Sequence, residues 1–157
     1  MHAVGIEIER KFLVAGKPPL APGAGARVEQ GYLVVADDVE VRLRRMDERF
    51  FLTVKRGTGL TRAEHEVALT AEQFDALWPA TEGRRLQKRR FEVALEGLTA
   101  EVDVYDGVLA GLVVAEVEFP TENGALGFTP PSWFGPEVTE DRRYGNRALA
   151  TASEPPR

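Results

Sequence analysis

Polar and apolar residues alternate along residues 5–14, near the start of the chain. Successive side chains of a β-strand point to opposite faces, so this alternation predicts a strand with one charged and one apolar face. Only Arg10 interrupts the apolar side. Taken alone, the segment is compatible with an edge strand whose charges are solvated. The charged positions are Glu7, Glu9 and Lys11, and the apolar positions are Ile6, Ile8 and Phe12.

Seven further segments have strand patterns bounded by turn residues, and we expect residues 57–59 to form one of the connections. Short turns between neighbouring strands predict antiparallel hairpins. Eight strands can close into a barrel with room for one ligand and no exposed edge. The expected fold is therefore α+β, a closed eight-stranded antiparallel β-barrel, or tunnel, with a few packing helices. The later strands are predicted at 27–35, 39–46, 50–56, 62–69, 84–95, 99–105 and 112–119.

One helix is predicted directly after the fifth strand. Thr70 and Gln73 have the spacing of a capping box, and Pro79 ends the helical pattern. Three apolar residues between them recur at helical spacing, and we expect this stripe to pack against the barrel. They are Phe74, Leu77 and Trp78.

The last quarter of the chain is interrupted by glycine and proline. Residues 120–136 predict a loop with room for a short helix, and residues 138–150 predict a terminal helix opened by Thr139. We expect a single domain over residues 1–150, followed by a disordered tail at 151–157.

Composition excludes several classes of function. The 157 residues carry a net charge of −5, which argues against nucleic acid as a partner, and no cysteine is present for disulfide or thiolate chemistry. The first residues lack the basic and apolar regions of a signal peptide. The longest apolar run, 107–115, is too short to span a bilayer. We therefore expect a cytoplasmic protein with no membrane partner.

Strand parity places most charges of the predicted strands on one face. Alternation alone does not determine whether that face is the interior or the surface of the barrel. The composition of the face favours the interior, because carboxylates occur as i, i+2 pairs on four strands and basic residues as pairs on two others. A hydrated tunnel holding metal ions and an anionic ligand would satisfy both signs of charge. The face comprises Glu7, Glu9, Lys11, Arg42, Arg44, Lys55, Arg62, Glu64, Glu66, Lys88, Arg90, Glu101, Asp103, Glu116 and Glu118.

An ordered set of motifs covers roughly the whole chain. It begins with Glu7-x-Glu9-x-Lys11 and continues through residues 40–44, 52–55, 116–118 and 137–146. In this order the motifs resemble the CYTH superfamily, the triphosphate tunnel metalloenzymes. The resemblance implies that residues 1–150 form one CYTH-like tunnel domain with divalent-metal-dependent triphosphatase activity.

Carboxylates are the expected metal ligands. Hard divalent cations prefer oxygen, and Mg²⁺ typically takes one or two carboxylates together with phosphates and waters. The resemblance assigns Glu7, Glu9, Glu116 and Glu118 to the binding of Mg²⁺ or Mn²⁺. Asp103 is a further candidate ligand.

Basic residues of the same face are the expected phosphate ligands, because arginine gives bidentate contacts and lysine a point charge. The resemblance adds Arg143, within the motif at 137–146, as a further phosphate ligand. The basic candidates on the strands are Lys11, Arg42, Arg44, Lys55, Lys88 and Arg90.

The reaction that the resemblance implies is hydrolysis of a triphosphate, with inorganic tripolyphosphate giving pyrophosphate and phosphate as the favoured case. Several carboxylates are candidates to orient the attacking water, and each is also a candidate counter-ion for a basic neighbour. The expected catalytic residues are Glu7, Glu9, Lys11, Glu64 and Glu66. The candidates to orient the water are Glu64, Glu66, Glu101 and Asp103.

Other catalytic classes find little support. The only serines are Ser132 and Ser153 and the only histidines His2 and His65, which disfavours a Ser/His triad. The glycine-containing segment 56–61 lacks the spacing of a P-loop.

Alternatives within and outside the family stay open at this point. The superfamily also includes thiamine-triphosphatases, RNA triphosphatases and class IV adenylate cyclases, which share the triphosphate site. A polyphosphate- or nucleotide-binding module without catalysis is a second class, and a structural barrel with a charged coat is a third. The expected partner is a small-molecule triphosphate, and a homodimer is a possible assembly.

Overall fold

The computed structural model describes residues 3–57 and 61–157, with side chains for residues 7–57 and 62–157. The predicted connection at 57–59 falls mostly on residues 58–60, outside the described residues, as does the side chain of Ile6. The strands are β1 (Ala3–Val14), β2 (Ala26–Val35), β3 (Val39–Met46), β4 (Arg49–Arg56), β5 (Thr61–Leu69), β6 (Arg85–Ala94), β7 (Thr99–Tyr105), β8 (Val113–Glu118) and β9 (Phe134–Glu137). The α-helices are α1 (Ala71–Leu77), α2 (Glu122–Leu126) and α3 (Asn146–Leu149), and the 3₁₀ helices are η1 (Trp78–Thr81), η2 (Gly107–Leu109) and η3 (Arg142–Tyr144).

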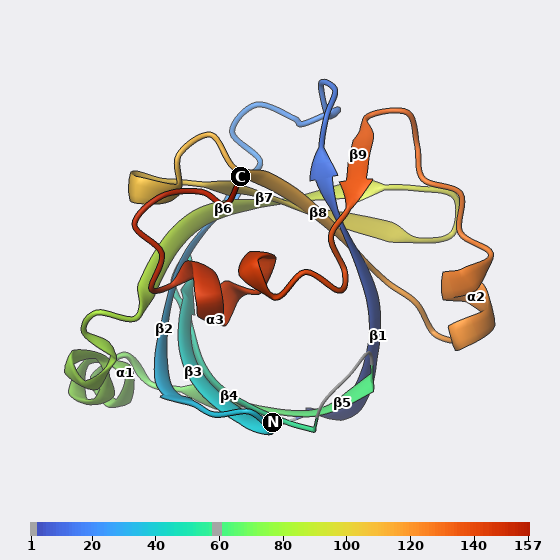
Figure 1. The fold of residues 1–157 in the computed structure, drawn as a ribbon. Coiled ribbons are helices and arrows are strands. Elements are labelled where there is room, and N and C mark those ends of the chain that lie inside the picture. Colours follow the sequence, from blue (N-terminus) through green and yellow to red (C-terminus); the bar gives the residue numbers. More distant parts are fainter. Residues whose placement is uncertain (1–2, 58–60) are drawn as a thin grey trace.

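Eight strands close into an antiparallel barrel (Figure 1). Their order is β5-β4-β3-β2-β6-β7-β8-β1, and pairing of β1 with β5 completes the ring. The predicted closed barrel is confirmed. Strand β9 pairs with the end of β1, with Phe12 opposite Glu137 and Val14 opposite Phe134. This ninth strand was not predicted, because it is short and contains Gly135 and Pro136, two residue types that are depleted in strands.

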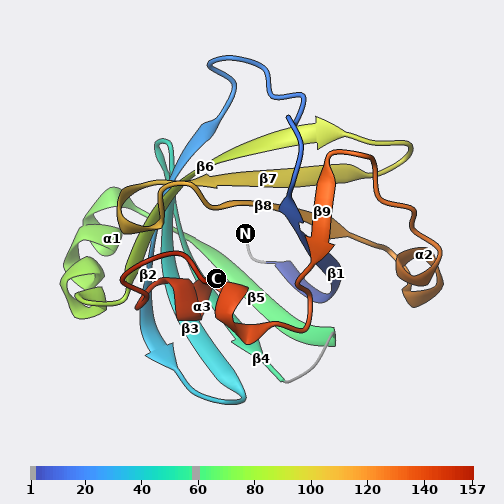
Figure 2. The same cartoon turned by 45° about the horizontal axis from the view of Figure 1, so that its top comes forward.

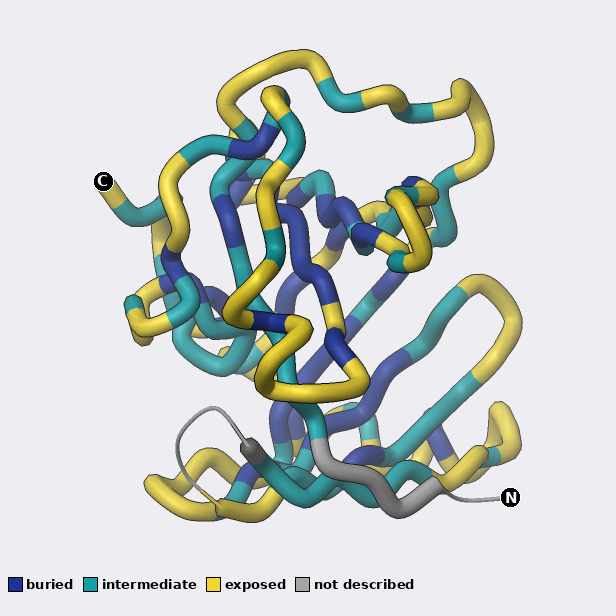
Figure 3. Tube along the Cα trace, turned by 90° about the vertical axis from the view of Figure 1, so that its right-hand side faces the viewer, coloured by how far each residue is buried: buried dark blue, intermediate teal, exposed yellow. Residues whose placement is uncertain are grey.

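The apolar outer side of β1, β7 and β8 is covered by the segment that follows β8. Phe12, Val102 and Val117 lie in one buried cluster with Ala125 of α2 and Phe134 of β9. Figure 2 shows α1 and α2 on opposite sides of the barrel. Along the trace in Figure 3, buried residues concentrate in the strands and exposed residues in the connections.

Helix α1 begins at the predicted capping box, in which the Thr70 and Gln73 side chains bond each other's backbone N–H. Phe74 is 4% exposed, and its ring centroid lies 5.0 Å from those of Phe50 and Trp78. Leu77 is 37% exposed, so its predicted packing against the barrel is wrong. A two-turn helix buries only a narrow stripe, and Leu77 lies at its edge.

The predicted terminal helix at 138–150 is wrong. Strand β9 ends at Glu137, and only the single turns η3 and α3 follow. The Asp141 side chain caps the first of these turns at the Arg143 N–H, and Gly145 is extended, at φ −67° and ψ 140°, between the two. Asp and Gly both favour caps and breaks over helix interiors.

Residues 151–157 follow a defined path beside the barrel. Ala152 packs against a buried cluster, and Arg143 Nη1 donates to the Arg157 carbonyl at 2.8 Å. These contacts give no support to the predicted disorder of this tail. Among the described residues, no helix is long and apolar enough to cross a membrane.

The contacts of α1 predict unequal effects of two substitutions on the free energy of unfolding. Phe74→Ala removes a buried ring and should cost about 3 kcal/mol, as large-to-small core changes do. Leu77→Ala should cost less than about 1 kcal/mol, because this side chain is exposed. Urea unfolding measures both, and equal losses would contradict the packing described for α1.

Candidate active site

The barrel encloses a cavity of about 280 Å³ whose wall is almost entirely charged. Ten of the residues predicted for the site line it. They are Glu7, Glu9, Lys11, Arg42, Arg44, Lys55, Glu64, Arg90, Glu116 and Glu118. The predicted inward orientation of the charged strand face therefore holds for these positions.

Cross-strand register brings charged residues of neighbouring strands together. Glu9 lies opposite Glu118, and Lys11 lies opposite Glu116. Lys11 Nζ is 3.5 Å from a Glu116 carboxylate oxygen, and Lys55 Nζ is 3.0 Å from Glu7 Oε1. Opposite charges thus pair along the cavity wall, between β1 and β8 and between β1 and β4.

Carboxylates crowd one part of the cavity. The neighbouring Glu116 carboxylate, together with burial, raises the pKa of Glu9 to about 8. Burial and the nearby Glu7 carboxylate raise the pKa of Glu118. A divalent cation would relieve this repulsion, so the donor set fits a hard metal ion. Within residues 3–57 and 61–157, no group of three acidic or histidine side chains is arranged to hold a metal ion by itself.

Basic groups crowd the rest of the wall. Burial, with Arg42 and Arg90 close by, lowers the pKa of Arg44 to about 9. Arg44 Nε donates to Gln30 at 2.9 Å, whereas the buried Nε of Arg42 has no hydrogen-bond partner within the described part of the chain. Unsatisfied buried donors are costly, and an anion such as phosphate would satisfy them.

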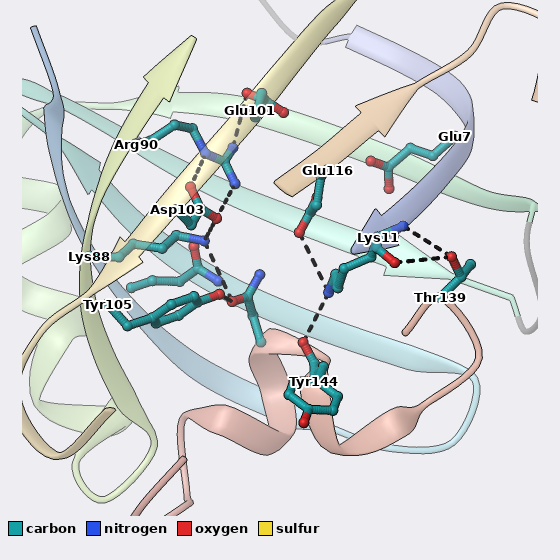
Figure 4. A network of polar contacts seen from close by, with 12 residues as sticks. Glu7, Lys11, Lys88, Arg90, Glu101, Asp103, Tyr105, Glu116, Thr139 and Tyr144 are labelled. Carbon is teal, nitrogen blue, oxygen red and sulfur yellow. Dashed lines mark hydrogen bonds and ion pairs between the residues drawn. The ribbon is translucent and has the colours of Figure 1, made fainter. Parts of the chain in front are cut away.

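Lys88 and Asp103 do not line the cavity, and Figure 4 shows their side chains paired with each other. Lys88 is 0% exposed, and its Nζ donates to Asp103 Oδ2 at 2.7 Å, while burial lowers its pKa to about 7. Asp103 also accepts from Arg90 Nε at 2.8 Å. Asp103 is therefore placed as the counter-ion of two basic residues. This geometry does not support its prediction as a metal ligand, nor direct phosphate contact by Lys88.

Two other predicted site residues do not reach the cavity. Glu66 accepts a long hydrogen bond from Thr53 Oγ1, at 3.4 Å, and does not line the wall. The Arg143 side chain is 58% exposed and pairs with Asp141 at 2.7 Å. Their roles in catalysis and phosphate binding stay predictions that the geometry does not support.

Several lining residues were not among the predicted site residues. Glu40 and Arg62 continue the inward parity of β3 and β5, and this signal was present in the sequence. Tyr32 of β2 also lines the cavity. Asn146 and Arg147 line the cavity from α3, and no periodic pattern in the sequence indicated them.

A closed antiparallel barrel with a charged interior is the tunnel architecture that the sequence motifs predicted. The CYTH domain family matches residues 5–128, and the chain belongs to that family. An inorganic triphosphatase of Nitrosomonas europaea is 49% identical over 146 residues, which are 92% of this chain and 96% of that protein. One of Acetivibrio thermocellus is 39% identical over 148 residues, covering 93% and 94%. A crystal structure of an inorganic triphosphatase superposes with a TM-score of 0.70 at 46% identity, covering 93% of this chain and 95% of that one.

The raised pKa of Glu9 predicts a pH-dependent stability. In EDTA the Glu9 carboxyl of the folded protein keeps a proton that the same group loses in the unfolded chain near its ordinary pKa of 4.5. The free energy of unfolding therefore falls as the pH rises from 4.5 to about 8. Glu9→Gln removes this penalty. The variant should gain on the order of 2 kcal/mol over the wild type at pH 8 and almost nothing at pH 5. Urea unfolding at both values measures the difference, and a pH-independent difference would contradict the crowding of Glu9 by Glu116.

Proposed function

We propose that this protein is a divalent-metal-dependent triphosphatase that hydrolyses inorganic tripolyphosphate to pyrophosphate and phosphate. The observation that carries the proposal is that one cavity of the barrel brings together crowded carboxylates and basic groups that lack enough negative charge nearby. The two relatives described as inorganic triphosphatases, which align over almost the whole chain, support the same substrate.

Four glutamates are proposed to offer ligands to the metal ion, Mg²⁺ or Mn²⁺, with substrate phosphates and water completing its coordination. They are Glu7 and Glu9 on β1 and Glu116 and Glu118 on the neighbouring strand β8. When bound, such an ion neutralises phosphate oxygens and lowers the pKa of a bound water. The triphosphatases of this family are metal-dependent as a class, whereas the choice between the two ions is part of the proposal.

Basic residues of the wall are proposed to position the substrate. Phosphoryl transfer depends mainly on positioning and on neutralising the charge of the phosphate oxygens. Arg42 and Arg44 on β3, Lys55 on β4 and Arg90 on β6 supply donors from three strands, so a chain of phosphates would contact several of them at once. Lys11 adds a further positive charge, beside Glu116.

Glu64 is the carboxylate that we propose to accept the proton of the attacking water. Of the four candidates considered above, only Glu64 and Glu101 line the cavity. Burial raises the pKa of Glu64, which brings a carboxylate closer to the pH at which a general base operates. Glu101 instead accepts a hydrogen bond from Arg90 Nη1 at 3.2 Å, which places it as a counter-ion.

The proposal predicts phosphate release that depends on metal and is strongest on tripolyphosphate. We would compare tripolyphosphate, ATP and thiamine triphosphate with Mg²⁺, Mn²⁺ or EDTA. Glu9→Gln and Lys55→Ala should each lower kcat/KM by about 100-fold or more, the scale of losing one well-placed charged group. The matched controls are Glu72→Gln and Lys17→Ala, whose side chains are exposed outside the cavity.

Two results would contradict the proposal. Formation of cyclic AMP and pyrophosphate from ATP, without release from tripolyphosphate, would indicate an adenylate cyclase. Tight tripolyphosphate binding without release of phosphate under any metal condition would indicate a binding module.

A homodimer and a cytoplasmic location stay predictions from the sequence.

A further inference from the structure

The segment after β9 closes one end of the barrel. Figure 1 shows η3 and α3 crossing the opening of the ring. Lys11 Nζ donates to the Tyr144 carbonyl at 3.0 Å, and Asn146 Oδ1 accepts from Tyr105 and from Lys88. Tyr144 and Leu149 are buried in the cluster at this end. The cavity therefore has a floor, formed by residues 145–147.

This floor lies outside the part of the chain that the family model matches. The match ends at residue 128, whereas the lining residues of the floor are Gly145, Asn146 and Arg147. Gly145 and Asn146 belong to the motif at 137–146 that resembles the superfamily, whereas Arg147 lies outside the motifs that carry the resemblance.

Positive charge collects around one buried carboxylate beside the floor. Glu40 lies 3.3 Å from Arg62 Nη1 and 3.9 Å from Arg147 Nη1, and its charge also acts on Arg42. Two guanidinium groups thus pair with Glu40, and that of Arg42 pairs with Glu64 at 3.9 Å. The Nε atoms of Arg42 and Arg62 are buried without a hydrogen-bond partner among residues 3–57 and 61–157.

Two neighbours position the Arg147 side chain and leave several of its N–H donors without a partner among the described residues. Its Nη1 donates to the Ala36 carbonyl at 2.7 Å, and its side chain is 30% exposed and lines the cavity. The bond to Ala36 is the one hydrogen bond that the Arg147 guanidinium makes to the described residues. A guanidinium has five N–H groups, so the remaining ones are available to an anion in the cavity.

We propose that Arg147 is a substrate-binding residue that docks the terminal phosphate of the triphosphate at the closed end of the barrel. The inference rests on the proposed function, since it places that substrate within the cavity. The excess of guanidinium groups around Glu40 and Glu64 attracts the terminal phosphate. Arg147 would thus have the role that the sequence assigned to Arg143.

Binding of tripolyphosphate in EDTA, measured by calorimetry and by the shift in thermal unfolding, tests the inference without turnover. Arg147→Ala should weaken binding about tenfold or more, the scale of one hydrogen bond to a charged group. Arg142→Ala is the matched control, because Arg142 is an exposed arginine of the same segment outside the cavity lining, and it should bind like the wild type. If Arg147→Ala does not fold, Arg147→Met keeps an unbranched side chain and removes the charge and the N–H donors.

Glu40→Gln separates phosphate binding from a merely structural contact. If Arg147 only fastened the floor through Glu40, then Glu40→Gln would weaken binding as Arg147→Met does, and the inference would be overturned. If Arg147 binds phosphate, removal of its counter-ion should leave binding unchanged or stronger, because more positive charge is left for the anion.

The two proposals fail in different ways. If the wild type releases phosphate and Arg147→Met binds tripolyphosphate as tightly as Arg142→Ala, the inference is overturned and the triphosphatase stands. If the wild type releases no phosphate but Arg147→Met binds tripolyphosphate more weakly than Arg142→Ala, the triphosphatase is overturned and the docking site stands.

Discussion

Charge inside a closed barrel has to be balanced inside it, and most features of this molecule follow from that constraint. An unpaired buried ion costs several kcal/mol, so each inward strand residue needs a partner or a ligand. Lys88 and Arg90 both donate to Asp103 and balance its charge. Glu9 and Arg44, in contrast, lack enough opposite charge nearby, and this imbalance makes the cavity suited to a metal ion and an anion together.

The barrel was predictable because alternation persists along eight strands and hairpin turns join neighbours. The inward direction of the charged strand face was inferred from pairs of like charges at i, i+2, which a solvent-exposed face does not require. The C-terminal segment was not predictable in the same way. Its apolar residues suggested a helix over 138–150, but Asp141 and Gly145 divide it into single turns whose positions depend on contacts with the barrel.

Strand parity identified the face of the site but not the depth of each residue. Glu101 and Asp103 have the same parity, yet one lines the cavity and the other is sealed behind it. That difference arises where Tyr105 and Asn146 close one end of the barrel, a tertiary contact with no local sequence signal. For the same reason the sequence favoured Arg143 over Arg147, because which arginine faces the cavity depends on how η3 and α3 fold back.

Binding of both the triphosphate and the metal ion inside the barrel would be visible in a crystal structure of the protein with tripolyphosphate and Mn²⁺, with anomalous scattering to locate the ion. We expect phosphate density between Arg42, Lys55 and Arg90, with the anomalous peak beside Glu9. Density for both ligands on the outer surface, with an empty interior, would contradict it.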